Sequence, residues 1–311
     1  MDQAVQYDPN VMLIKCLGVF LPFWSEGPQL RIRIAAPSHV WSDGTNLYWP
    51  FWNFRDRRML PTEVNFTSLE KFAALADAPP EKILQFASKW GVLGICRPHG
   101  LPHSAGPGCI PRLVGRAEDG SLIEISEDDP YDYLYVFETE LISEWRRYAR
   151  QFRSILNVVG ALNAGRLGDK SDWAVIMDGY RTSRDHVDPD FDNPARPDFD
   201  ESDARYIICE RIGDYVKIAH FRYELGFEKR RFRISLHGDD FYRLFAALSL
   251  LLMSAAGSAD AFVTCSACGN PYRPPRTPNP NRRNYCSDDC RKDGNALAAR
   301  EYRRRQRRLH Q

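Results

Sequence analysis

The chain has 311 residues, of which 43% are hydrophobic, enough to bury a substantial core in one large domain or two closely associated ones. Its charges nearly cancel, with 42 Lys+Arg against 41 Asp+Glu, which excludes a uniformly basic or acidic protein. The apolar stretch 11–24 is interrupted by Lys15, is too short to cross a bilayer and follows no basic region, so we expect neither a signal peptide nor a membrane partner. Together with eight cysteines, this predicts a cytoplasmic protein with reduced or metal-bound thiols.

Residues 1–66 are predicted to form a β-rich N-terminal segment. Residues 30–34 alternate between apolar and charged side chains, the pattern of a strand with one exposed face. We expect residues 48–54 to pair with them across a turn at Asp43-Gly44. The aromatic side chains nearby either pack in a buried hairpin, stack on single-stranded bases or line a ligand pocket, and burial is the favoured interpretation. They are Trp41, Tyr48, Trp49, Phe51, Trp52 and Phe54.

Residues 67–257 are predicted to form a mainly helical body. A capping box at Thr67-Ser68-Leu69-Glu70 opens a helix that runs to Ala78. The longest helix is expected over 138–164, because its apolar residues recur at helical spacing and a glycine follows them. The fold class is therefore α+β, mainly helical with small antiparallel strand clusters. Further helices are predicted over 81–90 and 239–254, and a strand cluster over 205–237, at 206–212, 215–221 and 231–236.

A loop within this body has the composition of a second metal site. Cys96, His99, His103 and Cys109 fall within 14 residues that are rich in glycine and proline, and these are residue types that bind Zn²⁺. A metal ion would order such a loop. The alternative is a surface loop that binds no metal.

Residues 185–203 form an acidic loop with eight carboxylates and three prolines. This composition is typical of a disordered linker. A second hypothesis is that the loop mimics phosphate, folds onto the basic C-terminal residues and inhibits nucleic-acid binding.

The C-terminal segment, residues 261–311, contains two close cysteine pairs. Cys265 and Cys268 are followed after 17 residues by Cys286 and Cys290. Two cysteines with two or three residues between them can bind one Zn²⁺ from the same turn through their thiolates. Two such pairs complete a tetrahedron that leaves no open coordination position. The sequence therefore predicts one structural zinc ion, bound by these four cysteines.

Local signals indicate a treble-clef-like zinc finger. Gly269 favours a tight knuckle after the first pair, and the prolines between 271 and 280 exclude a helix there. Ser287 is a typical N-cap, which places Cys290 in the first turn of a helix. Only about ten residues separate the helix 239–254 from the finger, so we expect the finger to dock on the body.

A strongly basic helix is predicted to follow the finger. Residues 265–311 hold 12 Lys+Arg and 4 Asp+Glu, a balance of +8, so residues 1–264 balance at −7. Four arginines spaced i, i+3, i+4, i+7 share one face and repel one another unless an anion such as a phosphate backbone lies along them. Tyr302 either stacks on a base or packs against the finger, and we favour packing. A solvated basic tail is the alternative. The candidate nucleic-acid-binding residues are Arg282, Arg283, Arg291, Lys292, Arg300, Arg303, Arg304 and Arg307.

The finger resembles that of a known family. The run Cys265-x2-Cys268-Gly269-x2-Tyr272-x-Pro274, then Arg283-Asn284-Tyr285-Cys286-Ser287-x2-Cys290-Arg291, is similar to the CGNR-type zinc finger. That finger closes bacterial proteins described as stress-related transcription regulators, which carry an ABATE-type N-terminal domain. The similarity covers about the last 45 residues, and Arg291-Lys292-Asp293 replaces the Gly-Asn-Arg that follows the family's last cysteine. The resemblance implies a bacterial protein in which the four cysteines bind zinc, but not the family's mode of DNA binding.

Taken together, the sequence predicts a zinc-finger nucleic-acid-binding protein, with DNA favoured over RNA. Its role would be transcription regulation, with an N-terminal body that senses a ligand or mediates assembly. The alternatives are a protein-interaction adaptor for an acidic partner or a second copy of the chain, and an RNA- or ribosome-associated factor. No Gly-rich phosphate loop, Gly-x-Ser-x-Gly or His-Glu-x-x-His motif occurs, so no catalytic residues are predicted and we do not expect an enzyme.

Overall fold

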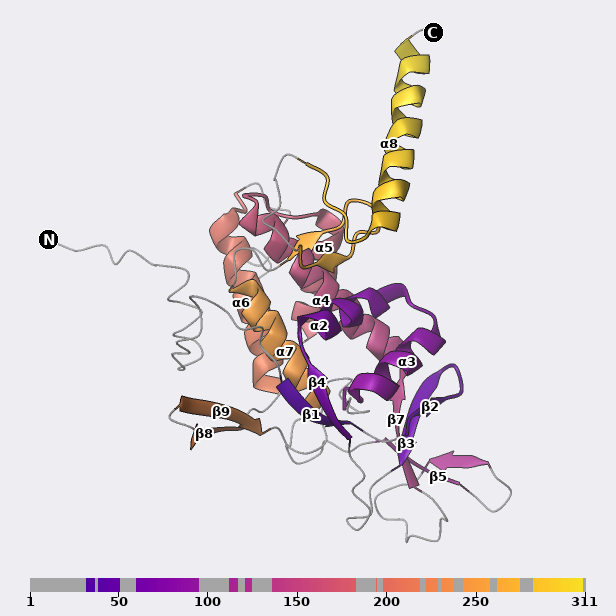
Figure 1. The fold of residues 1–311 in the computed structure, drawn as a ribbon, viewed down its shortest axis with the longest axis vertical. Coiled ribbons are helices and arrows are strands. Elements are labelled where there is room, and N and C mark those ends of the chain that lie inside the picture. Colours follow the sequence, from indigo (N-terminus) through magenta and orange to yellow (C-terminus); the bar gives the residue numbers. More distant parts are fainter. Residues whose placement is uncertain are drawn as a thin grey trace, which may run out of the picture. The chain divides into compact units, whose positions relative to one another are not determined.

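Most of the residues that the structure describes are helical, and the rest include small sets of antiparallel strands, which is consistent with the predicted α+β class (Figure 1). The computed structural model describes residues 32–36, 39–50, 60–94, 112–116, 121–124, 136–182, 194, 198–218, 222–228, 231–237, 243–257, 262–274 and 282–309. Two compact units can be distinguished, one drawn from Met1–Arg150 and Cys209–Ser254, the other from Gln151–Ile208 and Ala255–Gln311. The division of the sequence into three consecutive segments stays a prediction.

The first unit contains short strands that pair antiparallel. The largest sheet among the described residues has the order β2-β3-β7-β5-β6, while β1 pairs with β4 and β8 with β9. Their bounds are β1 Ile32–Ala36, β2 Trp41–Ser42, β3 Asn46–Pro50, β4 Leu60–Val64, β5 Arg112–Arg116, β6 Leu122–Glu124, β7 Val136–Leu141, β8 Arg222–Glu228 and β9 Arg231–His237.

The expected pairing of the first strand was wrong, although the turn was placed correctly. β1 lies beside β4, with Ile32 opposite Val64, whereas β3 pairs with β2 across the Asp43-Gly44 turn and with β7 on its other edge. The Asp43 carboxylate fixes that turn by accepting hydrogen bonds of 2.7 Å from the backbone N–H groups of Thr45 and Asn46. An alternating pattern specifies a strand with one exposed face, but it carries no information about which strand lies next to it.

The aromatic stretch is buried where it is described. Tyr48 and Trp49 belong to the core, and the half-buried Trp41 stacks on Tyr48 with ring centroids 5.7 Å apart. This confirms the hairpin interpretation for these three side chains. Phe51, Trp52 and Phe54 lie outside the described residues.

Two short helices follow in the first unit, α2 (Phe66–Ala73) and α3 (Pro80–Trp90), joined by the 3-10 turn η1 (Ala74–Asp77). The capping box lies two residues earlier than predicted. Asn65 accepts from the N–H groups of Thr67 and Ser68, and the Ser68 hydroxyl accepts from the N–H of Asn65. Asparagine caps a helix as well as threonine does, so the Thr67–Glu70 pattern was a misleading match.

The long helix α4 (Ile142–Asn163) contributes to both units, because the division falls after Arg150. Its predicted start was four residues too early, since Glu138 belongs to β7. In the first unit, Tyr148 meets Tyr215 and Phe245 edge to face, with ring centroids 5.3–6.4 Å apart. All three side chains are almost completely buried, and such aromatic clusters are strong contributors to a core.

The strands predicted at 206–212 and 215–221 are wrong. Residues Glu201–Ile218 form the helix α6. Of the three predicted strands only 231–236 is confirmed, as β9, and it pairs with β8, which was not predicted. The Asp200 carboxylate caps α6 by accepting from the N–H groups of Ser202 and Asp203, so the end of the acidic run 185–203 is ordered. The isoleucines favour a strand by propensity, but the buried positions repeat with a helical period. They are Ala204, Ile207, Ile208, Arg211, Ile212 and Tyr215.

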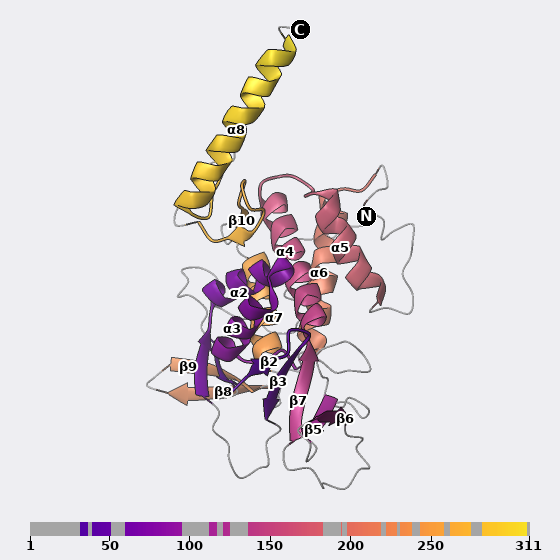
Figure 2. The ribbon, with the colours of Figure 1, turned by 90° about the vertical axis from the view of Figure 1, so that its right-hand side faces the viewer.

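The second unit combines the C-terminal half of α4 with α5 (Lys170–Thr182), the first part of α6 and the cysteine-rich C-terminal segment (Figure 2). Trp173 of α5 packs edge to face on Phe199, with ring centroids 5.3 Å apart, and donates its indole N–H to the carbonyl of Leu167. The helix α7 (Arg243–Ala256) leads into this segment. No described helix combines the length and the apolar character needed to cross a membrane.

Candidate metal centre

The first cysteine pair lies on a knuckle between two short strands, β10 (Val263–Thr264) and β11 (Pro271–Tyr272). The N–H of Cys265 donates to Asn270 O over 2.9 Å, and the N–H of Gly269 donates to Cys265 O over 3.0 Å. Gly269 has a φ of 71°, a conformation that glycine adopts without strain. The predicted knuckle is confirmed.

The second pair is positioned by the start of α8 (Asp288–Leu309). Ser287 acts as the N-cap, because its Oγ accepts from the N–H of Cys290 over 3.1 Å. Asp288 and Asp289 occupy the first turn, where negative charge is favoured by the helix dipole. Cys290 therefore lies within the first turn, as the sequence predicted, and Cys286 lies just before it.

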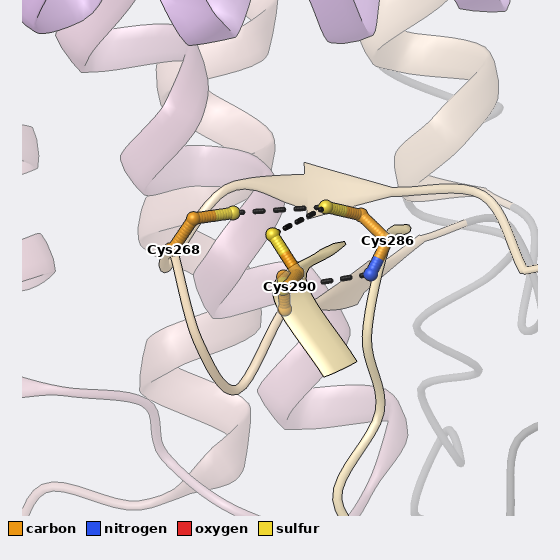
Figure 3. Close-up of side chains that lie close together, drawn as sticks. Cys268, Cys286 and Cys290 are labelled. Carbon is orange, nitrogen blue, oxygen red and sulfur yellow. Dashed lines mark hydrogen bonds between the residues drawn. The ribbon is translucent and has the colours of Figure 1, made fainter. Parts of the chain in front are cut away.

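The four sulfur atoms of Cys265, Cys268, Cys286 and Cys290 all lie within 4.8 Å of one another. Cys268 Sγ is 3.7 Å and Cys290 Sγ is 3.5 Å from Cys286 Sγ (Figure 3). A disulfide requires about 2.0 Å, so the cysteines are free thiols. A tetrahedron with metal–sulfur bonds of about 2.3 Å has edges of about 3.8 Å, close to the observed separations. The cluster can therefore bind a metal ion through four thiolates.

The electrostatics of the cluster also favour a cation. Burial raises the pKa of the Cys265 thiol, but N–H groups of Cys268, Cys286 and Ala267 directed at its sulfur outweigh this and lower the pKa to about 6. Burial and the neighbouring thiols raise the pKa of Cys286, because two thiolates side by side repel each other. A divalent cation removes that repulsion, so metal binding would release protons from the cluster.

The knuckle is attached to the helices of the second unit through Asn157 of α4. The Asn157 amide nitrogen donates to Gly269 O over 3.3 Å and to the Asp172 carboxylate, while its oxygen accepts from the Thr264 hydroxyl over 3.0 Å. A Cβ added at Gly160 would lie 3.0 Å from Phe262 O, so the backbone before β10 runs directly against α4. The expectation that the finger docks on the body is confirmed for the helices of this unit. The sequence analysis did not identify Asn157 as part of the site. The one signal that could have found it is an amide side chain within an apolar stretch of a predicted helix.

A second contact fixes α8 to the loop that precedes Cys286. The ring of Tyr285 lies on Gly294, where an added Cβ would come within 2.4 Å of Tyr285 Cε1. Gly294 is the one buried residue among the described side chains of α8. Glycine disfavours a helix interior, and its position here is explained by the close approach of the tyrosine ring.

The predicted nucleic-acid-binding residues are all exposed, and most lie on α8. Arg282 and Arg283 precede Cys286, while Arg291 and Lys292 pair with Asp288 and Asp289 over 3.0 and 3.5 Å. The other four, Arg300, Arg303, Arg304 and Arg307, are exposed on the second half of the helix. The favoured packing of Tyr302 is wrong. Its side chain is 64% exposed, because α8 extends away from β10 and α5 in both views (Figures 1 and 2).

Several predicted features fall outside the described residues. They include Cys96, His99, His103 and Cys109, so the second metal site stays a hypothesis. Most of the acidic run 185–203 lies outside as well. Within the part of the chain that is described, the four C-terminal cysteines form the single group of three or more His, Cys, Asp or Glu side chains placed to hold a metal ion.

A scan of the sequence against family models gave no match, and searches of curated proteins and of solved structures gave none either. The metal centre is therefore assigned from its geometry.

Proposed function

We propose that residues 262–309 form a zinc-held module that binds nucleic acid, and that the protein is a DNA-binding transcription regulator. The observation that carries this proposal is the exposed, arginine-rich second half of α8, attached at its first turn to a cluster of four cysteines. The module has the order of a treble-clef-like finger, with a knuckle, a loop and a helix-borne second pair. Its resemblance to the CGNR-type finger agrees with this assignment.

Zinc is the metal that best fits the four thiolates. Soft sulfur ligands in a tetrahedral arrangement select Zn²⁺ or iron–sulfur chemistry, and a site with four protein ligands has no open position for a substrate. We therefore assign the metal a structural role. It holds the knuckle, the loop before Cys286 and the start of α8 in one arrangement.

The net positive charge of α8 is concentrated in its second half, away from the cysteine cluster. Arg291 and Lys292 are offset by Asp288 and Asp289, whereas five arginines and one glutamate occupy positions 300–307. Arginines at this density repel one another, and the repulsion is relieved when phosphates bind between them. Such a helix binds a polyanion, of which nucleic acid is the most abundant in a cell.

The N-terminal body is proposed to sense a ligand or to mediate assembly. It supplies a separate compact unit whose strands and helices take no part in the cysteine cluster. Binding of the full chain to DNA as a function of protein concentration, together with its sedimentation behaviour, tests the assembly role.

Metal analysis tests the zinc assignment. Purified full-length protein should contain one zinc per chain, and Cys286→Ser should lose it, because three thiolates bind zinc far more weakly than four. Cys209→Ser is the matched control, since Cys209 lies on α6 outside the cluster. Two zinc ions in the wild type, one of which is lost in Cys96→Ser, would instead establish the second site.

Salt-dependent binding to a labelled DNA duplex tests the nucleic-acid role. Each phosphate contact contributes about 0.9 to the slope of log affinity against log salt, so changing Arg300, Arg303, Arg304 and Arg307 to alanine should make the slope shallower by about 3 to 4. Arg166→Ala, an exposed arginine in the same unit, should leave the slope unchanged. Failure of the wild type to bind DNA or RNA at low salt would reject the proposal in favour of the protein-adaptor alternative.

A further inference from the structure

The exposed half of α8 presents an uncharged stripe beside its arginines. At 3.6 residues per turn, positions spaced i, i+3, i+4, i+7 and i+11 fall on one face. Of the side chains on this face, three are exposed and two are half-exposed. We name this set the amide–alanine stripe, and it consists of Asn295, Ala298, Ala299, Tyr302 and Gln306.

Most of the stripe lies to one side of the face of α8 that meets the finger, and Ala298, one turn beyond Gly294, forms its near edge. Cys290 and Gly294 mark that face, because the first belongs to the metal cluster and the second lies under the Tyr285 ring. At about 100° per residue, the centre of the stripe lies roughly 110° around the helix axis from them. The amide–alanine stripe is thus free to approach a partner while the finger remains in place.

Basic residues border the stripe on both sides. Arg303 lies beyond Ala299 on one flank and Arg305 beyond Ala298 on the other, and all four side chains are at least partly exposed. Arg291 and Lys292 precede the stripe at the N-terminal end of the helix. An uncharged strip with cations along its borders complements a groove that has phosphates along both edges.

The chemistry of the stripe suits the edges of base pairs. An asparagine amide pairs in bidentate fashion with N6 and N7 of adenine, and alanine methyl groups contact the methyl group of thymine. Two adjacent alanines also let the helix backbone approach closely, which longer side chains would prevent. Asn295, Ala298 and Ala299 combine these properties within about one helical turn.

We propose that α8 lies in the major groove of double-stranded DNA, where Asn295 recognises an adenine and the flanking arginines bind the backbone phosphates. This inference rests on the proposed nucleic-acid function and specifies its ligand and its specificity-determining residue. The major groove of B-form DNA admits an α-helix, whereas that of an RNA duplex is too deep and narrow. From Asn295 to Gln306 the helix rises about 17 Å, which corresponds to roughly five base-pair steps of ~3.4 Å.

Charge complementarity selects DNA over a protein groove as the occupant. A helix that docks in an apolar groove presents large apolar side chains at i, i+3, i+4 and i+7. The stripe holds two amides and two alanines, and its one large side chain, Tyr302, ends in a hydroxyl group. The exposed Leu297 lies on a different face of α8, so it does not extend the stripe.

The test begins with full-length, zinc-loaded protein and a library of random DNA duplexes, from which the preferred site is selected. Affinity is then measured by fluorescence anisotropy for that site, for a scrambled duplex, for single-stranded RNA and for the same site with 7-deazaadenine, which lacks N7. We expect Asn295→Ala to weaken binding to the selected site by roughly 5- to 150-fold, the contribution of one bidentate pair. Binding to the scrambled duplex and the salt slope should not change.

Leu297→Ala is the matched control on the same helix and should retain the wild-type preference. The 7-deazaadenine substitution should weaken binding of the wild type but have no further effect on Asn295→Ala. Equal preference for the selected site in the wild type and Asn295→Ala would overturn the inference and leave the proposed function intact. Preferred binding to single-stranded RNA would also overturn the inference, and it would leave nucleic-acid binding intact but contradict the DNA-binding regulator. If the wild type binds no nucleic acid, both proposals fail.

Discussion

Two helices of this chain, α7 and α8, are stabilised in opposite ways. Every residue of α7 from Leu244 to Met253 is buried, so the helix is fixed by the removal of apolar surface from water. In α8, Gly294 alone is buried among the described side chains. That helix depends on the Ser287 cap, on alanine and arginine, which favour helices, and on the cysteine cluster at its first turn.

The difference shows how one chain can contain both a core and a surface for binding. A helix that is buried on all sides has no free face, whereas a helix attached only through its first two turns exposes most of its length. A metal ion bound by the four cysteines would make this possible, because it would supply locally the stability that burial supplies elsewhere.

Metal removal should produce the largest difference in stability between α7 and α8. Structural zinc contributes on the order of 10 kcal/mol to the folding of small zinc modules. We therefore expect a chelator, or Cys290→Ser, to remove hydrogen-exchange protection from residues 265–272 and from α8, while the amides of α7 keep theirs. Cys209→Ser should show wild-type protection in both regions. Loss of protection in α7 as well would mean that the metal supports the whole chain.

Truncation of a side chain in the aromatic core should instead destabilise the packing around α7 and leave the cysteine cluster unchanged. Phe245 is completely buried between Tyr148 and Tyr215, so Phe245→Ala should lower the free energy of unfolding by about 3–5 kcal/mol in urea titrations. Zinc content per folded chain should not change. Leu297→Ala on the exposed face of α8 should stay within about 0.5 kcal/mol of the wild type.

Gly294→Ala tests whether the tyrosine contact sets the position of α8. The added methyl group would collide with the Tyr285 ring, which should lower the stability of the finger by about 1–3 kcal/mol despite the better helix propensity of alanine. Truncating the ring in a Tyr285→Ala, Gly294→Ala double variant should relieve the collision. Gly213→Ala in α6 is the control, because a Cβ there meets no atom within 4 Å. Thermal unfolding followed by metal release provides the measurement.

Asn157→Ala should have an effect no larger than that of Gly294→Ala, about 1–3 kcal/mol, because it leaves Thr264 and the carbonyl of Gly269 without their shared partner. The expected readout is a faster loss of zinc to a chelator with little change in the urea midpoint of α7. Asn163→Ala, an exposed asparagine at the end of α4, serves as the control. Equal rates of zinc loss in the two variants would show that Asn157 does not hold the knuckle.

Sequence patterns predicted the local features of the metal centre well. The Cys265–Cys268 spacing, Gly269 and Ser287 each act within a few residues, so their consequences are visible without the rest of the chain. The strand prediction for 206–221 failed, because the isoleucines of α6 have a strand propensity that burial against other helices overrides. The packing of Tyr302 was predicted wrongly because no local sequence signal shows whether a helix packs against another element.

By itself, the sequence determined which residues can bind a metal ion and where a basic helix begins, since both follow from chemistry and backbone preferences within a few positions. Only the tertiary structure decided that β1 pairs with β4, that Asn157 holds the knuckle and that Gly294 receives the Tyr285 ring. Contacts of this kind join residues that the sequence does not mark as partners. They depend on shape, burial and hydrogen-bond geometry, which are established only when the chain has folded.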